Sequence, residues 1–407
     1  MRMRALARFT NNEWADVLPF KDEDGDKSPG CEPQLKESLV DFFRSENLVV
    51  LTGLGTSLCI KDDVFDEMLA PTMWHLWNGI RELVTPAVMD EVCEFVRQPK
   101  APKTGTSKKK KAKKKGTRKK KPVLEYKQDI ELLLSKCLTS QDFQPETMIE
   151  DFIKKAESKI VELCDFLEED TSLDIHEAFL RRIARRPTSN PRTKLFTTNY
   201  DLAFETAASR MHFVAVDGFS HTLPQSFDSS YFEYDLVRRA ENGVSPDYVQ
   251  NVFQLYKVHG SIDWQKNEER IVKQANPSDP VLIYPRTSKF ELSYESPFLD
   301  LISRFQAALR QSETSLLVIG FGFNDKHLSQ PILSAIRSNV GLRTIIVSPS
   351  LEASGNAAIE EIEGLIQSGD SRLSLIAGTF EDIVKYLPDL VSETEEEKHL
   401  KRIRGEE

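Results

Sequence analysis

The sequence contains little cysteine and no long hydrophobic run. Its 407 residues include five cysteines, which are scattered and form no CxxC pair. This pattern argues against a disulfide framework and a cysteine-rich zinc site. No stretch of 18 apolar residues occurs, and no apolar segment follows the start Met1-Arg2-Met3-Arg4. We therefore expect a soluble, cytoplasmic protein that has no membrane span and needs no metal.

Acidic residues are missing from one segment. Between Lys103 and Lys121 lie twelve Lys or Arg residues and no Asp or Glu. Taking these twelve positive charges out of the net charge of −10 leaves −22 for the rest of the chain, a body that repels nucleic acid. The only apolar residue in the segment is Ala112, so we expect a disordered, solvated loop over residues 101–122. Binding of DNA phosphates by Lys103–Lys121 is the alternative.

The rest of the composition suits a folded protein, with 40% hydrophobic and 9% aromatic residues. The clearest pattern is a run of alternating strands and helices near the C-terminus. It comprises a strand at 315–320, a helix at 326–337, a strand at 344–347, a helix at 356–367 and a strand at 373–376. This alternation predicts an α/β fold, a Rossmann-like doubly wound parallel sheet.

The apolar spacing divides the chain into parts. Residues 47–60 and 190–390 carry the α/β pattern, and a helical insertion with the Lys-rich loop separates them over 61–189. An N-terminal extension, 1–46, precedes the first strand, and residues 391–407 form a charged tail. Residues 220–250 show no pattern that assigns them to an element. The length of the chain agrees with two or three domains.

Four short loops each follow an apolar run that predicts a strand. They are Gly53-Leu54-Gly55-Thr56-Ser57, Thr197-Thr198-Asn199-Tyr200-Asp201, His259-Gly260-Ser261 and Gly320-Phe321-Gly322-Phe323-Asn324-Asp325. In an open parallel sheet, loops at the carboxyl ends of the strands meet in one crevice, and ligands bind there. The four loops therefore predict one shared nucleotide site.

The glycine loop between Gly53 and Ser57 suits a phosphate. Glycine lets the backbone approach an anion closely, and N–H groups at the start of a following helix would face it. The loop lacks the third glycine of a dehydrogenase fingerprint, because Leu58 stands near its place. An ordinary strand-to-helix turn is the alternative.

The other loops supply polar side chains. Asn199 can donate and accept hydrogen bonds at a ribose hydroxyl or a water, although a turn asparagine is the alternative. Asp201 suits a helix cap as well as a catalytic role, and Asp325 also suits a cap. His259 precedes Gly260 at a strand end, where an imidazole can take a proton from a sugar hydroxyl. A structural histidine is the alternative for His259.

The order of these motifs resembles the sirtuin family (silent information regulator type). That family has a GAGxS loop after its first strand, a TQNxD loop, an HG dipeptide with the catalytic histidine, and a late Gly-Ser/Thr loop. The matching residues are Gly53, Gly55, Ser57, Thr197, Asn199, Asp201, His259 and Gly260, with a looser match at Gly320 and Gly322. The resemblance covers about residues 46–60 and 190–390.

The chain departs from the sirtuin pattern where that family handles acetylated peptides. Thr198 replaces the usual Gln, no four-cysteine zinc module follows the HG dipeptide, and Val281-Leu282-Ile283-Tyr284-Pro285 stands in place of the Phe-Gly-Glu loop. The chain thus looks like the sirtuin-like effectors of bacterial anti-phage defence, which hydrolyse NAD. A chain of this size with a helical insertion looks most like the partner of a HerA-type ATPase-helicase, and we expect a homo-oligomer.

The resemblance implies a role for each predicted site residue. Asn199 would contact the ribose and a water, and His259 would act as general base. The remaining residues would bind the rest of NAD, which is the substrate: Gly53, Gly55, Thr56, Ser57, Asp201, Gly320, Gly322 and Asn324. The alternatives are an NAD-dependent deacylase or ADP-ribosyltransferase, and a non-catalytic NAD-sensing scaffold whose Lys loop touches DNA.

Overall fold

The computed structural model describes residues 2–21, 27–62, 66–99, 126–239, 247–268, 270–282 and 296–391, with residues 399, 402 and 403. The Lys-rich segment lies outside the described residues. By packing, the chain forms two compact units. Unit 1 comprises 1–70, 165–283 and 291–407, and unit 2 comprises 71–164 and 284–290. The domain limits predicted from sequence, 61–189 for the insertion among them, stay a prediction.

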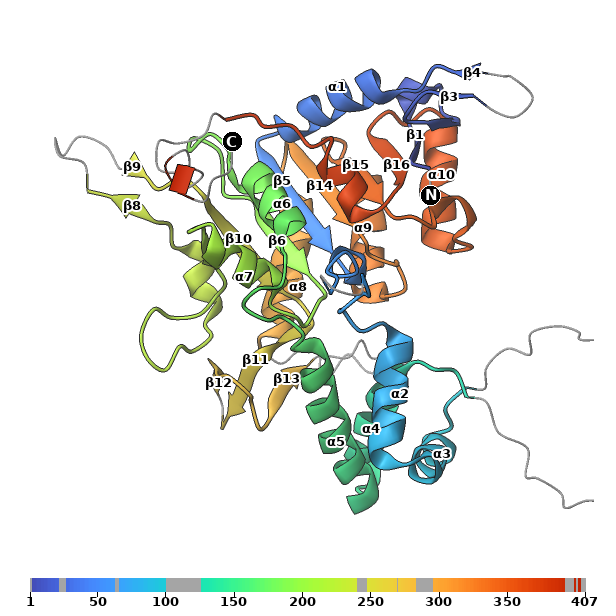
Figure 1. Ribbon diagram of the computed structural model, residues 1–407, viewed down its shortest axis with the longest axis vertical. Helices are drawn as coiled ribbons and strands as arrows, with labels where there is room; N and C mark the ends of the chain where they lie inside the picture. Colours follow the sequence, from blue (N-terminus) through green and yellow to red (C-terminus); the bar gives the residue numbers. More distant parts are fainter. Residues whose placement is uncertain are drawn as a thin grey trace, which may run out of the picture. The chain divides into compact units, whose positions relative to one another are not determined.

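Unit 1 is built on a nine-stranded sheet in the order β2-β1-β16-β15-β14-β5-β6-β10-β7. Figure 1 shows its central strands β14, β5 and β6. The parallel strands are β5 (Asn47–Thr52), β6 (Lys194–Thr197), β7 (Val214–Val216), β10 (Val252–Lys257), β14 (Thr314–Ile319), β15 (Arg343–Val347) and β16 (Leu373–Ala377). From β5, the strands β6, β10 and β7 extend the sheet on one side, and β14, β15 and β16 extend it on the other. The order therefore reverses between β5 and β14. This is the predicted doubly wound, Rossmann-like fold, which the sheet order confirms.

Helices cover both faces of this sheet. One face packs against α8 (Phe298–Leu309), α9 (Lys326–Ser338) and α10 (Ala357–Gln367). The other packs against α1 (Glu32–Phe43), α6 (Asp174–Ala184), α7 (Ala203–Arg210) and α11 (Phe380–Val384). Alternate strand residues point to opposite faces, so Val49 and Leu51 enter the first core while Leu48 and Val50 enter the second.

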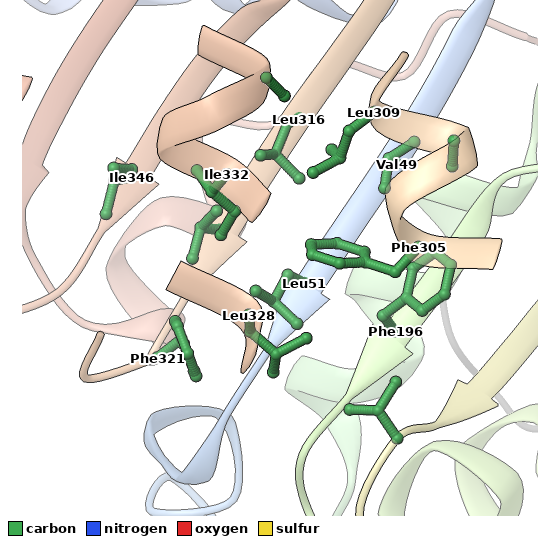
Figure 2. Close-up of a cluster of buried hydrophobic side chains, with 14 of the residues drawn as sticks. Val49, Leu51, Phe196, Phe305, Leu309, Leu316, Phe321, Leu328, Ile332 and Ile346 are labelled. Carbon is green, nitrogen blue, oxygen red and sulfur yellow. The ribbon is translucent and has the colours of Figure 1, made fainter. Parts of the chain in front are cut away.

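The first core shows how the strands fix the helices. Strand side chains form its floor: Val49 and Leu51 of β5 and Leu316 of β14. Above them pack Phe305 and Leu309 of α8 and Leu328 and Ile332 of α9 (Figure 2). All of these side chains are buried. Because both faces of β5 and β14 are covered, these strands are continuous apolar runs, as parallel strands in α/β proteins are. The packed helices in turn hold the loops that follow each strand.

The N-terminal extension joins the sheet at its edge. The strands β1 (Arg4–Leu6) and β2 (Trp14–Asp16) are antiparallel, and β1 pairs with β16. The helix of this region is α1, which buries Leu35, Leu39, Phe42 and Phe43 at helical spacing. Three-residue strands carry too few residues for a pattern to be recognised.

Smaller ribbons accompany the main sheet. A three-stranded antiparallel sheet contains β12 (Arg270–Lys273), β11 (Gly260–Asn267) and β13 (Pro280–Leu282), in that order. Two-residue strands form the pairs β3 (Phe20–Lys21) with β4 (Lys27–Ser28) and β8 (Val237–Arg238) with β9 (Asp247–Tyr248). The region 220–250, unassigned from sequence, thus holds β8, β9 and a short 3-10 helix at Ser229–Glu233.

Unit 2 is helical. It contains α2 (Met73–Val84), α3 (Pro86–Phe95), α4 (Ile130–Phe143) and α5 (Thr147–Cys164), and α2 and α4 both pack against α5. Apolar residues recur at helical spacing along α5, which buries Ile149, Phe152, Ile153, Ala156, Ile160 and Cys164. Across the described residues, no helix has the length and apolar character to span a membrane.

Candidate functional site

The four predicted loops leave the carboxyl ends of four adjacent strands. Ile319 of β14 pairs with Thr52 of β5, Thr52 pairs with Thr197 of β6, and Thr197 pairs with Lys257 of β10. Each loop begins within two residues of this line of paired residues. The structure therefore brings together segments that are 267 residues apart in sequence, at the edge where open α/β sheets bind ligands.

The loops after β5 and β14 touch through glycine. The N–H of Gly55 donates to the carbonyl oxygen of Gly320 over 3.1 Å. A Cβ on Gly55 would lie 2.5 Å from the Cα of Gly320, and one on Gly53 would lie 2.8 Å from the Gly320 oxygen. Gly320 also has a φ of +64°, which favours glycine. The close approach of two backbones at the point where the strand order reverses thus explains why these three positions are glycine.

The structure differs from the expected phosphate cradle. Residues 54–56 form a short 3-10 helix, and no α-helix begins within the described residues 54–62. The N–H groups of Gly53 and Gly55 donate to the carbonyl oxygens of Ile319 and Gly320, respectively. Those of Thr56 and Ser57 donate to the carbonyl oxygens of Gly53 and Leu54 within the loop. These amides therefore already have acceptors, and the binding of NAD by this loop stays a prediction.

A chain of hydrogen bonds orients Asn199. The carboxylate of Asp201 accepts a hydrogen bond from Ser57 Oγ over 2.7 Å, so this hydroxyl must accept one from Asn199 Nδ2, which lies 2.8 Å away. Thr56 Oγ1 donates a hydrogen bond to the Gly53 carbonyl and accepts one from Asn199 Nδ2 over 3.2 Å. Within the described part of the chain, no hydrogen bond reaches Asn199 Oδ1. The network thus fixes which way the amide points and leaves its acceptor oxygen for a ligand.

Asp201 also holds the loop to the next helix. Its Oδ1 accepts from the N–H of Ala203 at the start of α7, over 3.0 Å. Beneath the loop, Lys257 is 3% exposed, and its Nζ donates to the carbonyls of Tyr200 and Asp201 and lies 3.1 Å from Glu205 Oε1. Burial raises the pKa of Glu205, and the charge of Lys257 opposes this shift. Asp201 and Lys257 therefore support the loop that carries Asn199.

His259 lies on the neighbouring strand end. It follows β10 and precedes Gly260, whose φ is +84° and whose Cβ would lie 2.0 Å from the Val281 oxygen. His259 Nε2 is 2.9 Å from Asp325 Oδ2, and the ring centroids of His259 and Tyr200 are 6.5 Å apart. Asn199 and His259 are 7% and 5% exposed. The two side chains follow adjacent strands, two residues beyond the paired Thr197 and Lys257.

The remaining predicted residues lie at the rim. Gly322 and Asn324 are exposed, and Gly322 accepts a hydrogen bond from Asn356 Nδ2 over 3.4 Å. Neither contributes to the network around Asn199. A cavity of about 710 Å³ lies elsewhere, at the amino ends of β15 and β16, and is lined in part by Arg8, Arg343 and Arg372. Its position separates it from the strand ends that carry Asn199 and His259.

Two polar side chains of this edge were not predicted as site residues. The sequence predicts Asp325 as a helix cap and assigns no role to Lys257. Asp325 reaches His259 from the far side of two intervening strands, which no spacing in the sequence reveals. For Lys257 a signal existed, because a lysine in a mostly apolar parallel strand needs a buried partner.

Known structures share general features with this chain. One from work on the mechanism and regulation of Sir2 enzymes is 10% identical, over 92% of this chain and 100% of that chain, with a TM-score of 0.38. Two ADP-ribose complexes of variants of a Sir2 homologue are each 13% identical, over 91% of this chain and 97% of theirs, with TM-scores of 0.39 and 0.38. The sequence identities and TM-scores are too low to support any conclusion about this chain.

Sequence comparison gives a more specific result. No curated protein matches the chain. A family match covers a segment that includes the strand ends carrying Asn199, His259 and Asp325 and leaves out the loop after β5. Residues 193–363 match the SIR2-like domain.

Proposed function

We propose that the protein is a sirtuin-like NAD glycohydrolase that cleaves NAD to nicotinamide and ADP-ribose. The observation that carries the proposal is the hydrogen-bonded chain from Asp201 through Ser57 to Asn199, beside His259 at the adjacent strand end. It supplies an oriented amide oxygen and an imidazole, which suit the hydroxyls of a nucleotide sugar. The match of residues 193–363 to the SIR2-like domain supports NAD as the substrate.

The reaction needs positioning more than acid catalysis. The bond between nicotinamide and ribose breaks with its electron pair on the leaving group, which becomes neutral nicotinamide. Water attacks the resulting ribose cation and gives its proton to a ribose hydroxyl, whose own proton passes to His259. The products are ADP-ribose and one proton, which His259 returns to the solvent. In this proposal Asn199 Oδ1 accepts from a ribose hydroxyl or the water, and His259 takes a proton from a ribose hydroxyl. Thr56 and Ser57 hold Asn199, since their hydroxyls are fully buried and bonded to it.

We further propose a role in bacterial anti-phage defence by abortive infection, in the cytoplasm. A hydrolase that consumed NAD continuously would kill its host, so its activity requires control. Assembly into a homo-oligomer, or binding of a HerA-type ATPase-helicase, would supply that control. The resemblance to sirtuin-like defence effectors supports this part of the proposal.

Two other functions remain as alternatives. A deacylase or ADP-ribosyltransferase would use the same nucleotide site, and O-acetyl-ADP-ribose formed from an acetylated peptide would reveal the former. A non-catalytic scaffold would bind NAD and release no product. The oriented amide oxygen favours hydrolysis over the scaffold, because sensing does not require a group placed for a water or a sugar hydroxyl.

The test measures nicotinamide release from NAD, with and without a HerA-type ATPase. We expect Asn199→Ala and His259→Ala to lower the rate by at least about 100-fold, the usual scale for a positioned acid or base. Asn267→Ala and His221→Ala make the same changes at exposed positions and should retain the wild-type rate. Equal rates for all four variants would reject the proposed roles, provided that thermal unfolding shows each variant folded.

A further inference from the structure

The contact between His259 and Asp325 joins two strand ends that are not neighbours. In the sheet order, β5 and β6 lie between β14 and β10, so three strand spacings, roughly 14 Å, separate the two strands. The segment after β14 nevertheless brings Asp325 Oδ2 to within 2.9 Å of His259 Nε2. The side chains are 6% and 8% exposed, for His259 and Asp325 respectively. A buried contact over this span holds the imidazole from outside its own loop.

The two oxygens of Asp325 have separate partners. Oδ1 accepts from the N–H of His327 over 2.8 Å and so caps α9, while Oδ2 faces His259. The cap fixes the plane of the carboxylate, because α9 is packed into the core through Leu328 and Ile332 (Figure 2). The orientation of the histidine ring is therefore set by a packed helix.

The charge on Asp325 decides which ring nitrogen carries the proton. Burial alone would raise the pKa of Asp325, but its hydrogen bonds to His259 and to the His327 N–H, with the nearby histidine charges, hold that pKa below its ordinary value. An ionised carboxylate only accepts hydrogen bonds. The neutral ring of His259 must then carry its proton on Nε2, which makes Nδ1 the basic nitrogen.

We propose that Asp325 is a positioning residue that holds His259 in the Nε2–H form, with Nδ1 as the proton acceptor. Its consequence for catalysis rests on the function proposed above. Other titratable groups close to the pair are Tyr200, whose ring faces that of His259, and His327, which lies beside Asp325. A pH effect must therefore be separated from changes at these two residues.

Two substitutions separate positioning from capping. Asp325→Asn keeps the shape of the side chain and an oxygen for the His327 N–H, so its NH₂ group must face His259 and donate to Nε2. The ring is then forced into the Nδ1–H form. Asp325→Ser also caps a helix but is too short to reach the ring. Because both variants keep the cap of α9, thermal unfolding should stay close to wild type.

The first readout is the tautomer, which does not depend on turnover. Long-range proton–nitrogen NMR of ¹⁵N-histidine protein distinguishes Nε2–H from Nδ1–H, and the signal lost in His259→Ala identifies the residue. We expect Nε2–H in the wild type and Nδ1–H in Asp325→Asn. An unchanged tautomer in Asp325→Asn would overturn the proposal. If the wild type releases no nicotinamide, the proposed hydrolase fails, and this measurement still decides the role of Asp325.

The second readout is the rate of nicotinamide release. We expect Asp325→Asn to lower kcat by about 100-fold or more with little change in KM. Asp325→Ser should lower kcat less, because without the carboxylate the ring of His259 can adopt either tautomer. In Asp325→Ser the acid limb of the pH profile should move to lower pH, since the carboxylate that stabilises protonated His259 is gone. In His327→Gln the acid limb of the pH profile should stay at the wild-type pH. Wild-type kcat in both Asp325 variants would leave Asp325 as a cap alone and contradict the proposal.

Discussion

At the scale of single residues, His176 is the most unusual titratable group. It is 1% exposed, lies on α6 with ring centroids 5.2 Å from those of Phe204 and Phe380, and has no hydrogen-bond partner for either ring nitrogen among the described residues. Burial lowers the pKa of His176 to about 4, against a weaker opposing effect of Asp201. The native state therefore keeps this ring neutral where an unfolded chain would protonate it.

This histidine predicts acid sensitivity. Because its pKa is lower in the folded than in the unfolded state, the stability it contributes is fully present above pH 6.5 and is lost as the pH falls toward 4. The loss is on the order of 3 kcal/mol. We expect His176→Phe to lose less stability than the wild type between pH 7 and pH 4.5, measured by urea unfolding at each pH. His221→Phe, at an exposed position, should behave as wild type; equal losses in all three proteins would contradict the prediction.

At the scale of elements, the two loops that meet at the strand reversal should tolerate substitution very differently. In Gly55→Ala the new Cβ would meet the Gly320 Cα at 2.5 Å, and both are backbone, so the loops must move apart. That movement displaces Thr56 and Ser57, which hold Asn199. We expect a lower thermal midpoint and at least about tenfold slower nicotinamide release, since a displacement of about 1 Å can cost more than this.

The matched control for this prediction is Gly322→Ala in the same loop pair. There the new Cβ meets only the Nδ2 of the exposed Asn324, at 3.3 Å, and a surface side chain can move. We expect the thermal midpoint of Gly322→Ala to match that of the wild type. Equal defects in both variants would mean that close packing against Gly320 is not what Gly55 provides.

The elements also show what sequence can and cannot predict here. Apolar runs such as Leu316 to Ile319 gave β14 and its neighbours correctly, because strands buried on both faces must be apolar along their whole length. The meeting of the four loops followed from the rule for parallel sheets. The pairing of Asp325 with His259 did not follow, because it depends on a segment crossing two strand ends. The N–H groups of Gly53 and Gly55 likewise depend on acceptors that are remote in sequence, the carbonyl oxygens of Ile319 and Gly320.

At the scale of the whole molecule, charge is divided unevenly. The twelve basic residues between Lys103 and Lys121 leave a remainder with a net charge of −22. None of the candidate site residues lies in that segment, so nicotinamide release should not change when residues 103–121 are deleted. Binding to DNA should respond strongly, because a body of this charge repels phosphates and the basic segment neutralises them.

The expected result can be measured by fluorescence anisotropy with labelled duplex DNA between 50 and 200 mM salt. Any affinity of the full chain should fall steeply over this range, by about a thousandfold or more if six or more phosphates are contacted. The deletion variant should show no binding at any of these salt concentrations, while its rate of NAD cleavage equals that of the full chain. Salt-dependent binding that survives the deletion would require a basic surface on the folded units, and the charge argument would then be wrong. If neither protein binds, the basic segment has no duplex-DNA partner, and the nucleic-acid alternative is rejected.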